Sequence, residues 1–192
     1  DPGEELAAMC YDAGIEVTSL PGPAACITAL TLSGLSTRRF AFEAFLPWDK
    51  KERKEDLAEL VNETRTIILY EAPHRLVRTL KELLETLGNR RMTLCRELTK
   101  KHETAFRSTI EELINYYEEE KPLGECVLVI EGKSREEVAE EQRASWEEIS
   151  IEEHMEFYEK QGNSRKDAMK LVAKDRGTTK REIYQYLLQT EK

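Results

Sequence analysis

The sequence predicts an α/β fold, and three observations support this prediction. Short apolar runs rich in β-branched residues alternate with helical patterns between Phe40 and Ile130, which is typical of a sheet covered by helices. The run 126–130 is almost wholly apolar, which indicates a central strand that is buried on both faces. Beyond Gly132 the pattern changes to helix only. We therefore expect a sheet flanked by helices, followed by a small all-helical tail.

The expected elements follow from local patterns. Gly14, Gly34 and Gly88 close helical stretches, because glycine readily takes the left-handed conformation that ends a helix. Pro73 stops a strand and opens a helix, since proline is tolerated in the first turn of a helix but not inside a strand. We expect helices near residues 4–13, 24–32, 50–62, 73–87 and 109–119, and strands near 15–18, 40–46, 66–70, 92–96, 104–107 and 126–130.

Three capping-box signatures mark helix starts in the tail. In this motif a Ser or Thr hydroxyl caps the helix, and the acidic residue three positions later bonds back to the cap. Three short helices with a basic middle one resemble a helix-turn-helix module. The signatures pair Ser150 with Glu153, Ser164 with Asp167 and Thr179 with Glu182, and the expected small core consists of Ala168, Leu171, Val172, Ile183, Tyr184, Leu187 and Leu188.

Charge is distributed unevenly along the chain. The net charge of -9 argues against a protein that binds nucleic acid over its whole surface. Residues 134–159 hold ten Glu and two Arg, whereas residues 160–181 hold eight Lys or Arg and two Asp. An acidic connector thus leads into a basic tail, which can mark a nucleic-acid contact. The alternative interpretation of this charge pattern is a helical surface that is simply exposed to solvent.

The cysteines and the hydropathy bear on the compartment. Cys10, Cys26, Cys95 and Cys126 are scattered without a Cys-x-x-Cys motif, so we interpret them as small buried thiols in a reducing compartment. No apolar stretch approaches the length of a membrane span, and no signal-peptide pattern opens the chain. We therefore expect a cytoplasmic protein.

The segment 69–75 (LYEAPHR) is the strongest candidate for a site. It places Glu71, His74 and Arg75 directly after an apolar strand, at the carboxyl end where ligands bind in α/β sheets. Arg75 could neutralise a phosphate, and Glu71 could position a hydroxyl or accept its proton. The alternative is a Glu71–Arg75 ion pair that fixes the turn, and His74 is a weaker candidate.

A second charged segment, 96–103, follows another strand and is expected at the same edge. Like Glu71, its Glu97 could position a hydroxyl or accept its proton, and its Arg96 and Lys100 could neutralise phosphates. His102 is more typical of a surface residue. Two such clusters after successive strands favour one polar cleft that binds an anionic ligand.

The turn 21–25 (PGPAA) lies between a predicted strand and a helix. Gly22 and Pro23 restrict the turn and allow close backbone approach, while the helix that follows presents free N–H groups. The turn could hold the polar end of a ligand or could serve as a rigid interdomain connection. No metal-ligand spacing, phosphate-binding glycine loop or serine nucleophile motif is present.

Five motifs in one order resemble a known family. They are PGPAA at 21–25, FEAFLP at 42–47, YEAPHR at 70–75, RELTK at 96–100 with Glu103, and GECVLV at 124–129. Together they resemble the ribosomal small-subunit methyltransferase I family, a branch of the tetrapyrrole methylase superfamily. The resemblance implies a remnant of an N-terminal cofactor-binding domain at 1–20, a second α/β domain with a mixed sheet at 21–132, an acidic connector at 133–149 and a helix-turn-helix-like tail at 150–192.

The resemblance also implies a reaction, in which a methyl group passes from S-adenosylmethionine to the ribose 2′-hydroxyl of a cytidine in 16S rRNA. The implied partners are the small ribosomal subunit and a second copy of the chain, without a membrane. The resemblance implies catalytic roles for Glu71, Arg75, Glu97 and Lys100, cofactor binding by Gly22, Pro23, Tyr70, Arg96, Gly124, Glu125 and Cys126, and RNA binding by His74, Lys101, Lys166, Lys170, Lys174, Lys180 and Arg181.

The chain departs from the family pattern in two ways. The family has a domain before a Ser-Asp-Pro-Gly segment, whereas this chain begins at Asp1, so we expect it to bind S-adenosylmethionine weakly or not at all and to lack turnover. Ala24 and Ala72 stand where serine is common, and Ala44 where glycine is common. A tetrapyrrole methylase is the alternative enzyme, which the basic tail counts against. An RNA-binding assembly module is the alternative without catalysis.

Overall fold

The computed structural model describes residues 3–190, so the outermost residues of the predicted N-terminal remnant and of the predicted tail, 1–2 and 191–192, lie outside the described residues. Its centre is a five-stranded sheet of order β1-β2-β5-β3-β4. β1 pairs with β2 in parallel, while the other neighbours are antiparallel. The sheet is therefore mixed, as predicted. The strands are β1 (Phe40–Phe45), β2 (Thr66–Glu71), β3 (Arg91–Arg96), β4 (Thr104–Thr109) and β5 (Cys126–Ile130).

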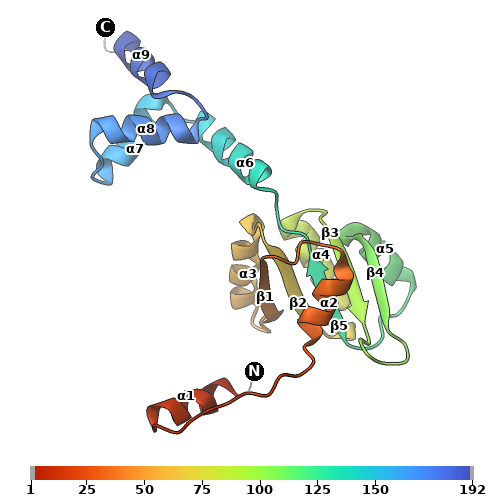
Figure 1. Cartoon of the computed structure of the whole chain (residues 1–192). Helices are drawn as coiled ribbons and strands as arrows, with labels where there is room; N and C mark the ends of the chain where they lie inside the picture. Colours follow the sequence, from red (N-terminus) through yellow and green to blue (C-terminus); the bar gives the residue numbers. More distant parts are fainter. Residues whose placement is uncertain (1–2, 191–192) are drawn as a thin grey trace.

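Helices cover the two faces of the sheet unequally (Figure 1). Ile67 and Leu69 face the larger core, whereas Ile68 between them faces the smaller one, because successive side chains of a strand point to opposite faces. All five residues of β5 are buried, which confirms the predicted central strand. The larger core is covered by α3 (Lys50–Glu59), α4 (Leu76–Leu87) and α5 (Ile110–Glu119), and the smaller one by α2 (Ala25–Ser33).

Several predicted boundaries needed correction. The helix expected at 50–62 ends at Glu59 and continues as the 3₁₀ turn η1 (Leu60–Asn62). The helix expected from Pro73 begins with a second 3₁₀ turn, η2 (Pro73–Arg75), in which the Arg75 N–H donates to the Ala72 carbonyl at 3.0 Å. β4 extends beyond the predicted range to Thr109.

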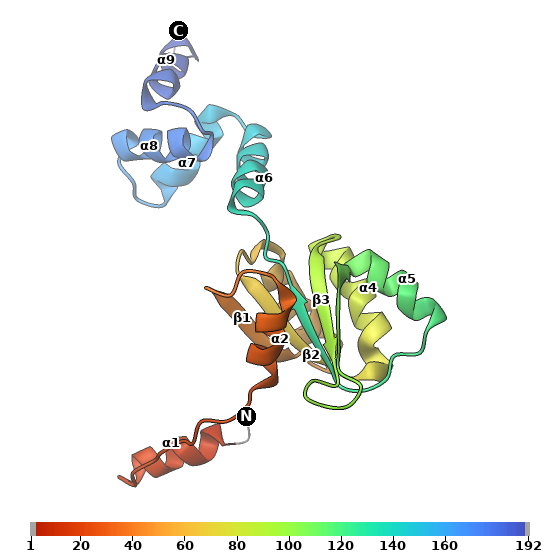
Figure 2. The same ribbon diagram turned by 45° about the vertical axis from the view of Figure 1, so that its right-hand side comes forward.

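The strand predicted at 15–18 was wrong. Residues 15–24 are irregular and mostly exposed, and no described strand pairs with them, so the β-branched pattern has no neighbour to complete a ladder. They follow α1 (Glu4–Asp12), none of whose residues is buried. Both views show α1 lying apart from the sheet, at the end opposite to the helical tail (Figures 1 and 2).

The predicted acidic connector is a helix. Ser134 and Glu137 form a reciprocal capping box that starts α6 (Arg135–Glu147). Three further helices follow as predicted: α7 (Ile151–Lys160), α8 (Arg165–Asp175) and α9 (Lys180–Thr190). Reciprocal capping bonds occur at Ser150 and Thr179, and the Ser164 hydroxyl accepts from the Asp167 N–H. Within residues 3–190, no helix is both long and apolar enough to cross a bilayer.

The tail has its own small core, of which part was predicted. Tyr184 and Leu188 were expected in it, but they are 52% and 47% exposed. α9 instead buries Ile183 and Leu187, one turn apart, so the neighbouring positions turn toward solvent. Leu171 is half-buried. The core consists of Met155, Ala168, Val172, Ala173, Ile183 and Leu187.

The aromatic ring of Trp146 joins α6 to this tail. It stacks on the buried His154 of α7, with 3.8 Å between the ring centroids and 7° between the planes. Arg176 Nε donates to His154 Nδ1 at 3.2 Å, and Asp175 Oδ2 lies 3.3 Å from His154 Nε2. Burial, followed by the charge of Arg176, lowers the pKa of His154 despite the nearby Asp175. The tail is thus held together around a neutral imidazole.

Candidate active site

The two predicted charged segments lie at one edge of the sheet. Because β1 and β2 are parallel, their carboxyl ends meet there. Cys126, the first residue of β5, pairs with Glu71 on one side and with Arg96 on the other. We call this end of the sheet, which is marked by Glu71, Arg96 and Cys126, the site edge. The tail leaves the sheet after Ile130, which pairs with Ile67 at the far end of β2.

Glu71 lies inside the protein and is 2% exposed. Its Oε2 accepts a hydrogen bond from the Thr79 hydroxyl at 2.5 Å, and its Oε1 accepts one from the Ala72 N–H at 2.9 Å. Arg75 Nε lies 3.4 Å from the same Oε1. The structure therefore contains the Glu71–Arg75 ion pair, and this carboxylate is fully engaged by the turn and by α4.

Arg53 completes the network below Glu71, although the sequence analysis did not single it out. Its side chain is 4% exposed, and its Nη2 lies 3.8 Å from Glu71 Oε2. It also donates to the Thr79 hydroxyl at 2.8 Å and to Glu82 Oε2 at 2.6 Å. Burial acts to raise the pKa of Glu82, but hydrogen bonds from Arg53 and Arg78 hold it below its usual value.

A signal for Arg53 was present in the sequence. α3 has mostly polar residues, but Leu57 and Leu60 follow Arg53 at four and seven positions, which places all three on one helical face. That face is buried. An arginine on it needs a carboxylate partner, because an unpaired buried charge is costly.

Arg75 links this network to the surface. Besides the Glu71 pair, its Nη2 donates to the Leu46 carbonyl at 3.3 Å. Its guanidinium carbon lies 4.2 Å from the ring centroid of Trp48, which is 80% exposed. The Arg75 side chain itself is only 12% exposed. The adjacent His74 is exposed.

Glu97, Lys100 and Glu125 form a clamp at the second segment. Glu97 Oε1 accepts from the Glu125 N–H at 3.0 Å and from Lys100 Nζ at 3.2 Å, and Lys100 Nζ also contacts Glu125 Oε2 at 2.9 Å. The Glu125 N–H and then Lys100 hold the pKa of Glu97 below its usual value, while the two carboxylates raise the pKa of Lys100. The clamp fastens the β3–β4 loop to the start of β5.

Gly124 is required beside this clamp. Its φ of +80° favours glycine, and a Cβ added there would lie 2.5 Å from the Glu97 side chain. The loop itself carries Glu97 at φ 51° and Thr99 at φ 65°. Residues without a glycine's freedom hold these conformations only where surrounding contacts impose them.

Two cavities open at the site edge. The first, of about 390 Å³, is mainly apolar and is lined by Ala25, Phe45, residues 70–73 and residues 125–127. The second, of about 650 Å³, is lined by Arg96, Glu97, residues 101–104, Leu123 and Gly124. Arg96 is held there by bonds from its Nε to the Leu123 carbonyl at 2.8 Å and from its Nη1 to the Tyr117 hydroxyl at 3.4 Å.

The predicted cofactor residues divide between these cavities. Tyr70, Glu125 and Cys126 line the apolar cavity, and Arg96 and Gly124 line the polar one. Gly22 and Pro23 line neither and are exposed. Burial raises the pKa of the Cys126 thiol to about 11, so it stays neutral and acts as an apolar wall.

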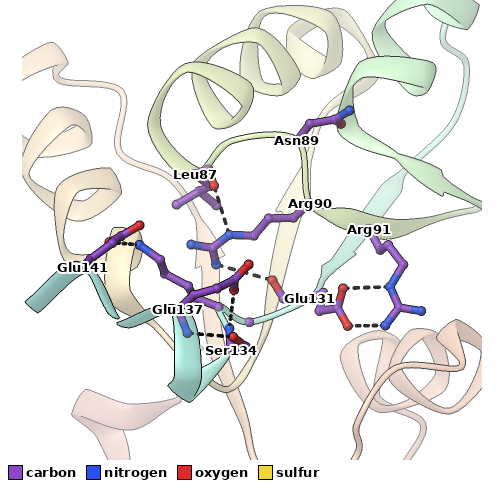
Figure 3. A pocket seen from close by; sticks show the side chains of 10 residues that line it. Leu87, Asn89, Arg90, Arg91, Glu131, Ser134, Glu137 and Glu141 are labelled. Atoms are coloured by element: carbon purple, nitrogen blue, oxygen red, sulfur yellow. Dashed lines mark hydrogen bonds and ion pairs between the residues drawn. The ribbon is translucent and has the colours of Figure 1, made fainter. Parts of the chain in front are cut away.

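A further cavity of about 530 Å³ lies at the junction of sheet and tail (Figure 3). Its cations already have partners. Arg90 donates to the carbonyls of Leu87, Glu131 and Val61, and Arg91 pairs with Glu131. Lys133 pairs with Glu141 of α6. We interpret this region as the attachment of the tail.

The basic residues predicted to bind RNA lie in two places. His74 and Lys101 are exposed at the site edge. Lys166, Lys170 and Lys174 form one exposed row along α8, at intervals of four residues, with Lys170 paired to Asp167 at 2.9 Å. Arg181 is exposed and Lys180 half-buried on α9. The tail row and the site edge lie at opposite ends of the sheet.

Comparisons with known proteins agree with the motifs. The family described as Tetrapyrrole (Corrin/Porphyrin) Methylases matches residues 1–114. A protein of Bacillus subtilis named ribosomal RNA small subunit methyltransferase I is 45% identical over 184 residues, which is 96% of this chain and 63% of that protein. A protein of the same name from Synechocystis is 43% identical and aligns with 100% of this chain and 67% of its own length. Another from Vibrio cholerae is 45% identical and aligns with 69% of this chain and 47% of its own length.

The chain thus spans a little under two thirds of the length of the Bacillus relative. Its five ordered motifs, the family match and these identities agree on one assignment. The chain belongs to the tetrapyrrole methylase family and, within it, to the ribosomal RNA small subunit methyltransferase I branch.

Proposed function

We propose that the protein transfers a methyl group from S-adenosylmethionine to the ribose 2′-hydroxyl of a cytidine in 16S rRNA. The observation that carries this proposal is the 45% identity over 184 residues to a relative named for small-subunit rRNA methylation. The assembly of both predicted charged segments at the site edge supports it. A tetrapyrrole methylase is the alternative, but a small macrocycle requires no basic helical tail.

The apolar cavity suits one side of S-adenosylmethionine. Its volume of about 390 Å³ lies in the range of small-molecule sites. The Tyr70 hydroxyl, which accepts from the Cys26 N–H at 3.0 Å, fixes the ring that forms one wall. The cofactor would supply a methyl carbon bound to a positively charged sulfur. Tyr70, Glu125 and Cys126 are the residues that would hold it.

In this proposal the chain acts mainly by positioning. The transfer would join the ribose oxygen to the methyl carbon as the carbon–sulfur bond broke, and the hydroxyl proton would pass to a base or to water. Such an in-line displacement depends on the placement of two substrates. Glu71 is buried and fully paired, so we assign it the role of fixing Arg75 and the turn. Glu97 and Lys100 fix the opposite wall.

RNA binding is proposed for the two basic regions. At the site edge His74, Arg75 and Lys101 would lie beside the target nucleotide. The exposed row on α8 would contact phosphates farther along the RNA, because exposed lysines attract the backbone without reading sequence. The proposed domains are 1–20, 21–132 and 150–192, with the connector 133–149 containing α6.

The proposal extends to a homodimer acting on small ribosomal subunits in the cytoplasm.

The proposed activity is tested by methyl transfer. The whole protein is incubated with tritiated S-adenosylmethionine and undermethylated small ribosomal subunits, with porphyrin precursors in parallel. We expect label in 16S rRNA and a large loss of label with Arg75→Ala, whereas Lys81→Ala, on the exposed surface of α4, should retain it. Label in the porphyrin alone would assign the protein to the tetrapyrrole branch. RNA binding without any transfer would favour an assembly module.

A further inference from the structure

Trp48 is the most exposed large aromatic residue among the described residues, at 80%. It follows β1 in the loop Leu46–Asp49, next to Phe45, which lines the apolar cavity of the site edge. A tryptophan in water loses the apolar burial that ordinarily stabilises it. The sequence motifs do not include it, and the reaction proposed above does not use it.

The ring of Trp48 is held from one side. The Arg75 guanidinium lies over it at 4.2 Å from the centroid. Arg75 is in turn fixed by Glu71 at 3.4 Å and by the Leu46 carbonyl at 3.3 Å. A chain of contacts therefore runs from the buried Glu71 through Arg75 to an exposed ring, which restrains the ring before any ligand binds.

The high exposure of Trp48 leaves much of the ring accessible to solvent beside this contact. A planar π-system could stack there at little entropic cost, because the aromatic ring is already oriented. Unpaired bases of RNA are held in this way, on aromatic rings and on arginine guanidinium planes.

The charges around Trp48 favour a nucleic acid over an apolar protein segment. Lys50 and Lys51 follow it at the start of α3, and His74 precedes Arg75, all of them exposed, with Lys51 Nζ 3.8 Å from Glu55 Oε1. Asp49 is occupied as the cap of α3, where its Oδ1 accepts from the N–H groups of Lys51 and Glu52 at 2.8 and 3.1 Å. The exposed cations nearest to Trp48 in the chain could pair with the phosphates on either side of a stacked base.

We propose that Trp48, held by Arg75, is a stacking platform for an unpaired nucleobase of the RNA substrate, at the rim of the site edge. This inference rests on the proposed function, because it names how the same site holds its RNA. Trp48 would act as a binding residue that sets the register of the strand.

The test measures RNA binding and tryptophan fluorescence of the 192-residue chain. Trp146 is the only other tryptophan of the chain, so in a Trp146→Phe background Trp48 is the sole reporter. The probe is a short single-stranded oligocytidylate, and its matched control is an oligonucleotide of the same length and charge with abasic sites. The variants are Trp48→Ala, which removes the ring, and Trp48→Phe, which keeps one.

We expect the oligocytidylate to quench Trp48 and Trp48→Ala to bind it roughly ten- to a hundredfold more weakly, the size of one base–aromatic stack. Trp48→Phe should stay within about threefold of the parent. The abasic control should bind parent and Trp48→Ala alike. The urea unfolding midpoint should not change in Trp48→Ala, because the ring is exposed.

Equal binding of the oligocytidylate by the parent and by Trp48→Ala would overturn the proposed stacking platform. Trp48 fluorescence that changes with protein concentration but not with added RNA would overturn it as well. This failure is separate from failure of the proposed function. If the whole protein with Trp48→Ala still methylates 16S rRNA with an unchanged KM, only the platform is wrong. If the unaltered protein methylates no RNA, the proposed function is wrong.

Discussion

The site edge and the helical tail both contain many charged residues, but they use them differently. At the site edge, Arg53 and Glu71 are buried and paired through the Thr79 hydroxyl. In the tail, Lys166 and Lys174 are exposed along α8. Buried charges act by fixing geometry, so their removal should destabilise the fold. Exposed charges act through the field around the protein, so their removal should alter only salt-dependent binding.

Arg53→Met should produce the largest effect. It leaves Glu71 and Glu82 without their shared partner, and breaking a buried ion pair costs about 3–5 kcal/mol of unfolding free energy. Urea unfolding followed by far-UV circular dichroism measures this. The matched control is Arg78→Met. Arg78 also pairs with Glu82, but its side chain is 58% exposed, so its removal should cost under about 1 kcal/mol of unfolding free energy. Equal losses would mean that burial of Arg53 is not what matters.

Gly124→Ala should have the next largest effect, because it needs a left-handed conformation and crowds Glu97. Gly162→Ala is its control, since Gly162 has a similar φ of +88° but nothing within 4 Å of an added Cβ. The conformation alone costs about 1–2 kcal/mol in each. We therefore expect Gly124→Ala to lose more stability in the same urea experiment. Similar losses of stability in the two variants would show that the Glu97 side chain moves away from the added Cβ without a measurable loss of stability.

The tail should lose stability in acid, because its buried His154 has a lowered pKa. Below the ordinary pKa of about 6.5, unfolded His154 binds a proton that the folded tail resists, so stability is complete above that pH and falls below it. Thermal unfolding followed by Trp146 fluorescence in a Trp48→Phe background tests this. His154→Phe should remove the pH dependence in this acid range, and a dependence that persists would exclude His154 as its source.

The smallest expected effect concerns the α8 row. Lys166→Gln with Lys174→Gln should leave unfolding unchanged and weaken RNA binding evenly across sequences. The slope of log affinity against log salt should fall by about one for each phosphate that is no longer neutralised. Lys81→Gln with Lys121→Gln removes the same charge from the α/β part and should leave the slope unchanged. An unchanged slope in the α8 variant would remove the tail from the RNA contact.

The sequence predicted the parts of the molecule that depend on local patterns. The run 126–130 identified the central strand, and capping residues located three tail helices. The two charged segments were correctly placed at one edge, because strand ends determine where loops meet. The Glu71–Arg75 ion pair, one of the two alternatives for this segment, is present in the structure at 3.4 Å.

Tertiary contacts account for what the sequence missed. Residues 15–18 have the composition of a strand, but no described strand pairs with them. The acidic connector contains α6, and the sequence analysis did not note that Ser134 and Glu137 at its start carry the same capping signature as the tail helices. The role of Arg53 depends on Glu71 and Glu82, residues far along the chain.

The central claim, methylation of a ribose hydroxyl, has one most direct measurement. 16S rRNA labelled by the whole protein with tritiated S-adenosylmethionine is hydrolysed in alkali, which cleaves RNA only where a free 2′-hydroxyl can attack the neighbouring phosphate. The account predicts label in an alkali-resistant dinucleotide that begins with cytidine, and loss of that label with Arg75→Ala. Label released in mononucleotides would place the methyl group on a base and contradict the account.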